Sequence, residues 1–344
     1  MAAFDFQSLS TAQVQELAEL ANAAYAGVSP PAGWSLIREQ ETSGASARAF
    51  QNGSTLTVSF RGTDNPAADA LDILSLLVGN SYINEFSGFL NGVVGDISAR
   101  GITEIFVTGH SLGGAAANIL RDVSGSQFSG AFSGATYVTF ASPKIANNQN
   151  ILNIGHENDW VFKATQALLG QPEFQSTTDH IVWYNTLLAL NNDLGTGIRS
   201  VTEFAVNADS SPHKIDNYID TIARVAGSEF YSQTTRDMTI LVDEVDLLVT
   251  PLGSSSSNAS GPALILGEAR ADAHRGGSSG DFIEGLGGND FLEGQGGNDN
   301  ISGGTGNDEM VGGSGNDTLN GGAGQDAAFF TTSGSGLTAN LTQG

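Results

Sequence analysis

The 344-residue sequence contains no cysteine, which excludes disulfide bridges and thiolate metal sites. Basic residues are also scarce, because 13 Lys and Arg stand against 37 Asp and Glu, for a formal net charge of −24. This balance argues against nucleic acid or an anionic membrane surface as the main partner, and it suits divalent cations. No stretch approaches the ~18 uninterrupted apolar residues of a membrane-spanning helix, so no such helix is expected.

Positive charge is absent from the first part of the chain. The first basic residue is Arg38, so the positively charged region of a cleavable secretory signal is lacking. If the protein is exported, we expect a route that does not use such a signal.

Composition changes sharply at PLGSSSSNASG, a stretch rich in serine and glycine. Before it, patterns typical of helices alternate with patterns typical of strands, which predicts an α/β fold with a mostly parallel sheet and flanking helices. After it, the sequence is repetitive. We predict an α/β domain over residues 1–250, a linker over 251–262 and an all-β domain over 263–344.

Local signals place several elements in the first domain. Ser10 followed by Gln13 predicts a capping box for a helix that runs to about Ala26. Asn52-Gly53 predicts the turn of a hairpin. Further predicted elements are a helix over 86–101, a strand over 102–108, helices over 112–123 and 215–226, and strands over 136–143, 151–155 and 179–185.

From Gly276 the sequence repeats every nine residues, in six uninterrupted copies over residues 276–329. Residues 267–275, GEARADAHR, keep Gly267 and Asp272 in register as a degenerate first copy. The repeat resembles the RTX calcium-binding nonapeptide G-G-x-G-x-D-x-U-x, which forms an all-β parallel roll. Each copy combines a glycine-rich turn with one carboxylate, and carbonyl and carboxylate oxygens are the ligands that calcium prefers.

The resemblance implies that two copies make one turn of the roll, so that aspartates two copies apart share an ion. The implied carboxylate ligands are Asp281, Asp290, Asp299, Asp308, Asp317 and Asp326. The implied carbonyl ligands belong to Gly285, Gly287, Gly294, Gly296, Gly303 and Gly312. One apolar residue per copy is expected to point inward: Ile283, Leu292, Ile301, Met310, Leu319 and Ala328.

Residues 276–344 carry nine acidic side chains and no Lys or Arg. We expect this segment to be unfolded at micromolar calcium and folded at millimolar calcium. Since RTX proteins leave bacteria by type I secretion, the resemblance also implies an extracellular location and the type I secretion apparatus as a partner. The alternative is a flexible acidic tail that binds no metal.

The pattern Gly-x-Ser-x-Gly occurs twice, at residues 109–113 and 276–280, and 45 glycines make a chance match common. The second match lies inside the repeats, so Ser278 is interpreted as a turn residue. Ser111 instead lies between a predicted strand and a predicted helix, which is the arrangement of a nucleophile elbow. The alternative is a plain glycine-rich turn.

A serine nucleophile needs a base, and the chain contains five histidines. His110 is adjacent to Ser111 in the turn itself. His156 and His180 lie in or beside predicted strands, and His274 belongs to the degenerate first repeat. His213, in a polar loop before a predicted helix, remains as the candidate base.

An acid must orient the base. Asp159 follows a predicted strand and lies between Ser111 and His213, which is the chain order of α/β-hydrolases. Asp179 and Asp209 are alternatives.

Residues 14–225 resemble the class 3 lipase family of α/β-hydrolases in ordered motifs. These are TVSFRGTDN, SGFLNGV, VTGHSLGGAAA, VTFASPKIAN, END and PHKIDNYI. The resemblance implies a catalytic triad of Ser111, Asp159 and His213. It also implies an oxyanion hole formed by the backbone N–H groups of Thr63 and Leu112.

The resemblance implies a lipid substrate at an oil–water or membrane interface, with triacylglycerol as the leading substrate class and phospholipase A1 activity as the alternative. Residues 68–83 are rich in leucine and are expected to form either a mobile lid or an ordinary core helix. We expect a monomer with no nucleic-acid partner. A hypothesis of another class is a catalytically inactive, calcium-ordered adhesin.

Overall fold

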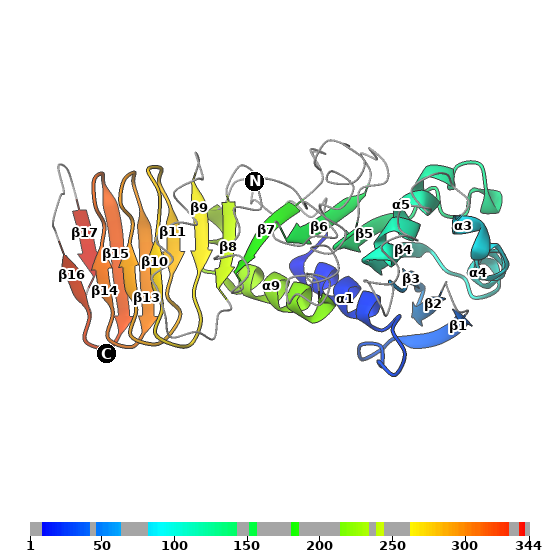
Figure 1. Ribbon diagram of the computed structural model, residues 1–344. Helices are drawn as coiled ribbons and strands as arrows, with labels where there is room; N and C mark the ends of the chain where they lie inside the picture. The colour runs from blue at the N-terminus through cyan, green and yellow to red at the C-terminus, as the bar shows by residue number, and fades with distance from the viewer. Residues whose placement is uncertain are drawn as a thin grey trace, which may run out of the picture. The chain divides into compact units, whose positions relative to one another are not determined.

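The computed structural model describes residues 9–41, 46–62, 82–142, 151–156, 180–185, 214–233, 239–243, 262–329 and 337–340 (Figure 1). The chain forms two compact units. The first, called the α/β unit, comprises Phe6–His180 and Leu194–Ile222. The second, called the repeat unit, comprises Met1–Asp5, Ile181–Asp193 and Ala223–Gly344. The predicted linker lies outside the described residues apart from Pro262, so that boundary stays a prediction.

The α/β unit is built on a sheet with the strand order β1-β2-β3-β4-β5-β6. The strands are β1 (Ser35–Glu41), β2 (Ser46–Asn52), β3 (Thr55–Phe60), β4 (Glu104–His110), β5 (Thr136–Phe140) and β6 (Leu152–His156). The first three strands are antiparallel, and the turn after Asn52 closes the predicted hairpin. From β3 to β6 all pairs are parallel, which confirms the predicted α/β class.

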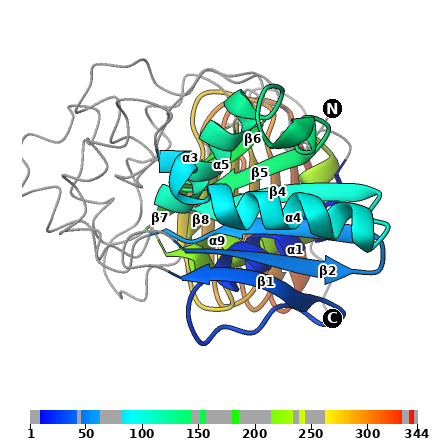
Figure 2. The same cartoon turned by 90° about the vertical axis from the view of Figure 1, so that its right-hand side faces the viewer.

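Helices cover both faces of this sheet (Figure 2). The helices are α1 (Thr11–Asn22), α3 (Tyr82–Glu85), α4 (Ser87–Ala99), α5 (Leu112–Val123) and α9 (Ile215–Gly227). Ser59 and Thr108 point toward α1, because their hydroxyls donate to the carbonyls of Leu20 and Leu17 at 2.9 and 3.3 Å. Since side chains alternate along a strand, their neighbours Val58 and Val107 point to the opposite face.

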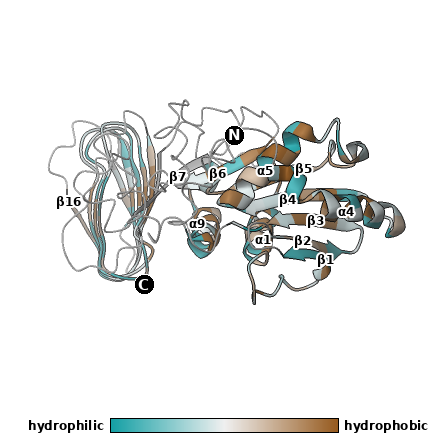
Figure 3. Cartoon of the chain, turned by 45° about the vertical axis from the view of Figure 1, so that its right-hand side comes forward, coloured by the Kyte–Doolittle hydropathy of each residue, from teal (hydrophilic) through white to brown (hydrophobic). Residues whose placement is uncertain are grey.

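That opposite face forms the main core, where α4 and α5 carry brown apolar segments in Figure 3. Leu56, Val58 and Phe60 from β3 are fully buried with Leu90 of α4 and Ile119 of α5. Burial stabilises each such side chain by about 1.5–3 kcal/mol relative to exposure. None of the helices within the described residues is long and apolar enough to cross a membrane.

Helix α1 begins as predicted. The N–H of Gln13 donates to Oγ of Ser10 at 3.2 Å, and the N–H of Ser10 donates to Oε1 of Gln13 at 2.9 Å. This reciprocal pair is the capping box expected from the sequence, and it fixes the start of the helix.

The prediction that this helix continues to about Ala26 was wrong, since it ends at Asn22. Arg48 on β2 donates from Nη1 to the carbonyls of Ala23 and Tyr25, at 2.8 and 2.9 Å. A guanidinium thus satisfies carbonyls that a continuing helix would use internally, so the chain turns away at this point.

The repeat unit contains two parallel sheets, drawn from green to red in Figure 1. One sheet has the order β7 (His180–Asn185), β8 (Thr239–Asp243), β9 (Ala263–Leu266), β11 (Phe282–Glu284), β13 (Asn300–Thr305), β15 (Asp317–Ala323), β17 (Leu337–Asn340). The other consists of β10 (Ala273–Arg275), β12 (Phe291–Glu293), β14 (Glu309–Val311) and β16 (Ala327–Phe329).

The repeat register matches the prediction of two copies per turn. Phe282 pairs with Asn300 and Phe291 pairs with Glu309, which is a step of 18 residues in each sheet. The predicted inward residues form one buried cluster, in which Ala328 is partly buried. His274 takes this inward position in the first copy and is 1% exposed, so residues 267–275 are part of the roll.

The start of the roll is covered by the last turn of α9 and the chain that follows it. Ser228 donates from Oγ to Glu284 Oε1 at 2.6 Å, and the rings of Phe230 and Phe282 lie 5.2 Å apart. Arg224 donates to the carbonyl of Gly267. Glu284 is buried, which raises the pKa of its carboxyl.

Candidate active site and repeat sites

Ser111 occupies the sharp turn between β4 and α5. Its backbone has φ 58° and ψ −129°, a conformation that non-glycine residues rarely adopt, and the residue is 1% exposed. Its side chain does not cap α5. A strained serine between a strand and a helix is the geometry of a nucleophile elbow, as the sequence predicts.

Glycines make this turn possible. A Cβ on Gly109 would stand 2.5 Å from the carbonyl carbon of Gly113, and a Cβ on Gly113 would stand 2.6 Å from that of Phe60. These are backbone atoms, which cannot move aside as a flexible side chain can. Neither glycine of the motif can therefore carry a side chain without a backbone clash. This disfavours the alternative of a plain glycine-rich turn.

Leu112, one of the two predicted oxyanion donors, directly follows Ser111 at this turn. Leu112 is the first residue of α5, and the first N–H groups of a helix have no partner within it. Thr63 lies outside the described residues, but Gly62 directly before it lies beside the elbow. A Cβ on Gly62 would stand 2.8 Å from Ser111 Cβ, so the segment directly after β3 adjoins the serine.

Asp159 and His213 also lie outside the described residues, as do residues 68–81 of the predicted lid. The elements next to the two triad candidates are described. β6 ends at His156, three residues before Asp159, and α9 begins two residues after His213. Because β3 to β6 run parallel, the chain leaving β6 emerges at the same sheet edge as Ser111.

A buried polar cluster, which the sequence analysis did not anticipate, ties α5 to the segment after β5 and to the start of β6. Nδ2 of Asn118 lies 2.9 Å from the carbonyl of Gly114, 3.1 Å from Ser142 Oγ and 3.2 Å from Asn153 Oδ1. Asn118 is fully buried. The cluster joins the helix that follows the elbow to segments further along the chain, and no periodic pattern marks its members.

A second such contact joins His110 to Tyr25. His110 Nδ1 lies 2.9 Å from the Tyr25 hydroxyl, and the imidazole is turned toward this tyrosine. The two residues are 85 positions apart, so no local motif connects them.

In the roll, Asp281 accepts a hydrogen bond from the N–H of Ala263, and each of the other five predicted aspartate ligands accepts one from the N–H of the aspartate one turn earlier. The N–H of Asp281 donates to Oδ1 of Asp299 at 2.8 Å, and the N–H of Asp290 donates to Oδ1 of Asp308 at 3.0 Å. The second oxygen, Oδ2, is buried without a hydrogen-bond partner in Asp290, Asp299, Asp308, Asp317 and Asp326. Buried carboxylate oxygens of this kind are costly unless a cation or a donor faces them.

The surroundings of these oxygens suit a cation. A Cβ added to Gly285 would stand 2.7 Å from the carbonyl oxygen of Gly303 and close to Oδ2 of Asp290, so both oxygens lie beside this glycine. The equivalent positions beside other copies involve the carbonyls of Gly294, Gly312 and Gly321. Carboxylate and carbonyl oxygens are the types of ligand that calcium prefers, and the assignment of these residues as ligands stays a prediction. Gly287 and Gly296 instead pair with Thr305 and Ser314, and their role as ligands stays a prediction.

Electrostatics support this arrangement. Burial, with the charges of Asp308 and Asp272 adding to it, raises the pKa of Asp290 to about 7. Burial, together with Asp281 and Asp317, raises the pKa of Asp299 to about 7. The protein alone therefore disfavours the ionised carboxylates that a cation would stabilise.

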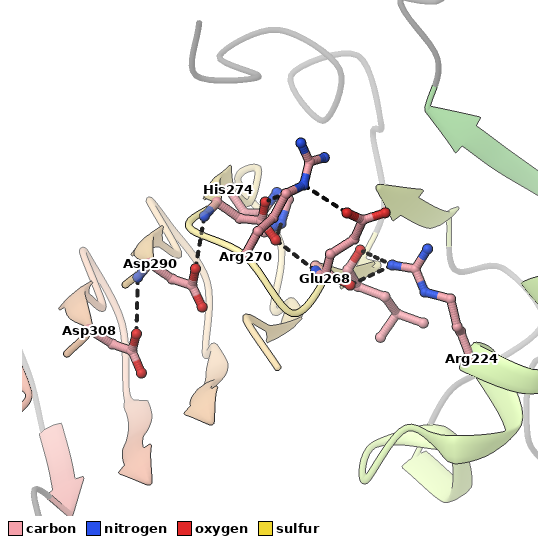
Figure 4. A network of polar contacts seen from close by, with 9 residues as sticks. Arg224, Glu268, Arg270, His274, Asp290 and Asp308 are labelled. Atoms are coloured by element: carbon pink, nitrogen blue, oxygen red, sulfur yellow. Dashed lines mark hydrogen bonds and ion pairs between the residues drawn. The ribbon is translucent and has the colours of Figure 1, made fainter. Parts of the chain in front are cut away.

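The first copy differs, as Figure 4 shows beside the Asp290–Asp308 ladder. Oδ2 of Asp272 accepts the Glu268 N–H at 2.6 Å, and Nε2 of His274 lies 3.8 Å from it. Burial favours a higher pKa for Asp272, but His274, the Glu268 N–H and Arg270 together lower it. This carboxylate thus has partners from the protein itself.

Two family models match the chain. Residues 80–164 match lipase (class 3), a span that includes Ser111, Leu112 and Asp159. Residues 275–310 and 302–328 match the RTX calcium-binding nonapeptide repeat (4 copies), a span that includes all six predicted aspartate ligands.

The names of similar proteins agree with the lipase match. Two proteins from Pseudomonas fluorescens named lipase are 34% and 37% identical over 211 and 169 residues, covering 54% and 46% of this chain. These matches span 43% and 36% of the relatives' own length. The crystal structure of the extracellular lipase LipA from Serratia marcescens is similar with a TM-score of 0.64 and 26% identity, over 81% of this chain and 54% of that one.

Proposed function

We infer that this chain, which carries a class 3 lipase region followed by RTX calcium-binding repeats, is a secreted, calcium-dependent lipase. We assign it the hydrolysis of triacylglycerol esters by a Ser-Asp-His mechanism. The observation that carries the proposal is the conformation of Ser111, held at φ 58° between β4 and α5 with Gly62 at its side.

In the proposed mechanism, His213 removes the proton of the Ser111 hydroxyl as its oxygen attacks the ester carbonyl. Asp159 orients the imidazole and stabilises its charged form. The N–H groups of Leu112 and Thr63 bind the oxygen of the tetrahedral intermediate. His213 then protonates the leaving alcohol, and water releases the fatty acid from the acyl-enzyme.

The repeats have a separate role in the proposal. Calcium supplies the positive charge that the buried aspartates lack, so it folds the roll at extracellular concentrations. The six repeat aspartates, with the carbonyls of Gly285, Gly294, Gly303 and Gly312, are the proposed ligands. Export through a type I secretion apparatus fits a segment that is unfolded before it meets calcium. The extracellular relative from Serratia marcescens supports this location.

Phospholipase A1 activity is the second candidate, because the same triad cleaves the acyl ester of a phospholipid. A calcium-ordered adhesin with an inactive hydrolase fold is the third. The strained Ser111 disfavours it, since strain of this kind persists where a function needs it.

The test is fatty-acid release from triolein and phosphatidylcholine emulsions at millimolar calcium, with Ser111→Ala as the control. We expect triolein hydrolysis that the substitution lowers by at least about 10⁴-fold. Release from phosphatidylcholine alone would assign phospholipase activity. Lipid binding without release from either emulsion would favour the adhesin.

A further inference from the structure

The contact between His110 and Tyr25 lies directly behind the candidate nucleophile. His110 is 5% exposed, and its Nδ1 is 2.9 Å from the Tyr25 hydroxyl. The ring centroids are 6.1 Å apart and the ring planes are tilted by 59°, so the two rings do not stack. The Tyr25 hydroxyl instead meets the edge of the imidazole at Nδ1. The family matches assign neither residue a role.

Tyr25 is held from both ends. Arg48 binds its backbone carbonyl at 2.9 Å, which anchors it to β2. Its hydroxyl lies 2.7 Å from the point that a Cβ on Gly62 would occupy, and Ser111 Cβ lies 2.8 Å from the same point. The hydroxyl therefore borders the backbone of Gly62 on the side of the nucleophile. The next residue along the chain is Thr63, the proposed oxyanion donor.

The other side of the imidazole faces α9. The ring of Tyr218 meets His110 edge-on with centroids 6.1 Å apart, and Tyr218 is fully buried. Tyr218 also contacts Phe140 at the end of β5, at 6.3 Å. Because Tyr218 lies five residues after His213, His110 packs between the elements that lead to the oxyanion donor and to the base.

We propose that Tyr25 and His110 form a positioning pair for the reaction. Their hydrogen bond fixes the backbone at Gly62 beside Ser111, and so the point from which the chain continues to Thr63, the proposed oxyanion donor. The pair acts through these neighbours and does not itself contact the reacting atoms. Displacing a catalytic donor by about 1 Å can cost ~100-fold in rate, so one well-placed hydrogen bond has a large effect here. This inference rests on the proposed esterase function.

The test compares Tyr25→Phe with Tyr137→Phe. Tyr137 is a matched control, because its hydroxyl also makes a hydrogen bond inside the α/β unit, to the carbonyl of Phe132 at 3.0 Å, and it lies near the start of β5. We expect Tyr25→Phe to lower kcat by at least about tenfold with KM unchanged, and Tyr137→Phe to leave kcat unchanged at a similar loss of thermal stability.

His110→Phe, alone and combined with Tyr25→Phe, tests whether the two residues act together. If they do, the double variant loses no more kcat than either single variant. If the losses in kcat of the two single variants multiply in the double variant, the two residues act independently and the proposed pair is wrong. A wild-type kcat in Tyr25→Phe would also contradict the proposal.

A second readout separates this inference from the substrate assignment. The rate at which a p-nitrophenyl alkylphosphonate labels Ser111 is measured for each variant, because its tetrahedral adduct needs the oxyanion donors but no lipid. If the wild type is labelled yet cleaves no lipid, the lipase assignment fails. The labelling rates of the variants then still test whether Tyr25 and His110 position the oxyanion donors. If Ser111 is not labelled at all, both proposals fall.

Discussion

At the scale of single residues, the backbone around Ser111 leaves no room for substitution. Gly113→Ala would place a Cβ 2.6 Å from the carbonyl carbon of Phe60 and 2.8 Å from that of Arg61. We expect a loss of about 1–3 kcal/mol in the free energy of unfolding, and loss of esterase activity, because backbone on two elements must shift. Thermal unfolding followed by circular dichroism measures the first effect.

Gly95→Ala in α4 is the control for that substitution. Nothing lies within 4 Å of its added Cβ, so alanine should stabilise the helix by about 0.5–1 kcal/mol. Equal melting temperatures for the two variants would contradict the role assigned to Gly113.

A different strain occurs in the roll. Gln295 and Leu286 adopt φ values of 69° and 68°, whereas later copies place glycine at the same position, as in Gly304 with φ 99°. We expect Gln295→Gly to lower the calcium concentration at the folding midpoint, because relief of the left-handed conformation contributes about 1 kcal/mol. Ser278→Gly, at a position without positive φ, should raise that midpoint slightly. If both variants shift it upward, the strain argument is wrong.

At the scale of elements, the copies of the repeat are not equivalent. Asp308 Oδ2 is buried without a partner, whereas Asp272 Oδ2 accepts the N–H of Glu268 (Figure 4). We expect Asp308→Asn to reduce the calcium bound per chain by one ion, since a neutral amide oxygen is a weaker ligand. Asp272→Asn, the same change in the same ladder, should leave the amount bound unchanged. Equilibrium dialysis measures both, and an equal loss in the two variants would refute the distinction.

At the scale of the whole molecule, the repeat unit and the α/β unit should respond differently to the removal of calcium. In EDTA at pH 8 we expect the circular dichroism of the roll to be lost while the helices of the α/β unit persist. Lowering the pH toward 4 should restore part of the roll. Asp290 and Asp299 have folded-state pKa values of about 7, above the ordinary value of 3.8. Their protonated forms therefore stabilise the fold at low pH, and this stability is lost as the pH rises through about 7.

The same argument reverses when calcium is present. The ion requires ionised carboxylates, so the calcium-loaded roll should be more stable at pH 8 than at pH 5. A calcium-free roll that becomes more ordered as the pH rises would contradict the assigned burial of these aspartates.

Local and periodic features could be predicted well from the sequence. The nine-residue period sets the register of 18 residues per turn, because each copy repeats the same backbone path and its neighbours stack on it. The elbow was recognisable because its strand, glycines and helix are contiguous between Glu104 and Val123. The start of α1 was also predictable, since the capping box spans only Ser10 to Gln13.

Only the tertiary structure decided the features that depend on contacts between distant residues. Helix α1 stops at Asn22 because Arg48, from a strand that follows it, binds the carbonyls of Ala23 and Tyr25 just beyond that end. The contacts of His110 and Asn118 join residues far apart in the chain, and a side-chain hydrogen bond between such residues leaves no periodic trace. By itself the sequence determined the order of elements, the repeat register and the identity of the candidate nucleophile, because these follow from neighbours along the chain. Packing decided which polar groups acquired partners and which carboxylate oxygens did not, because that depends on what the fold brings beside them.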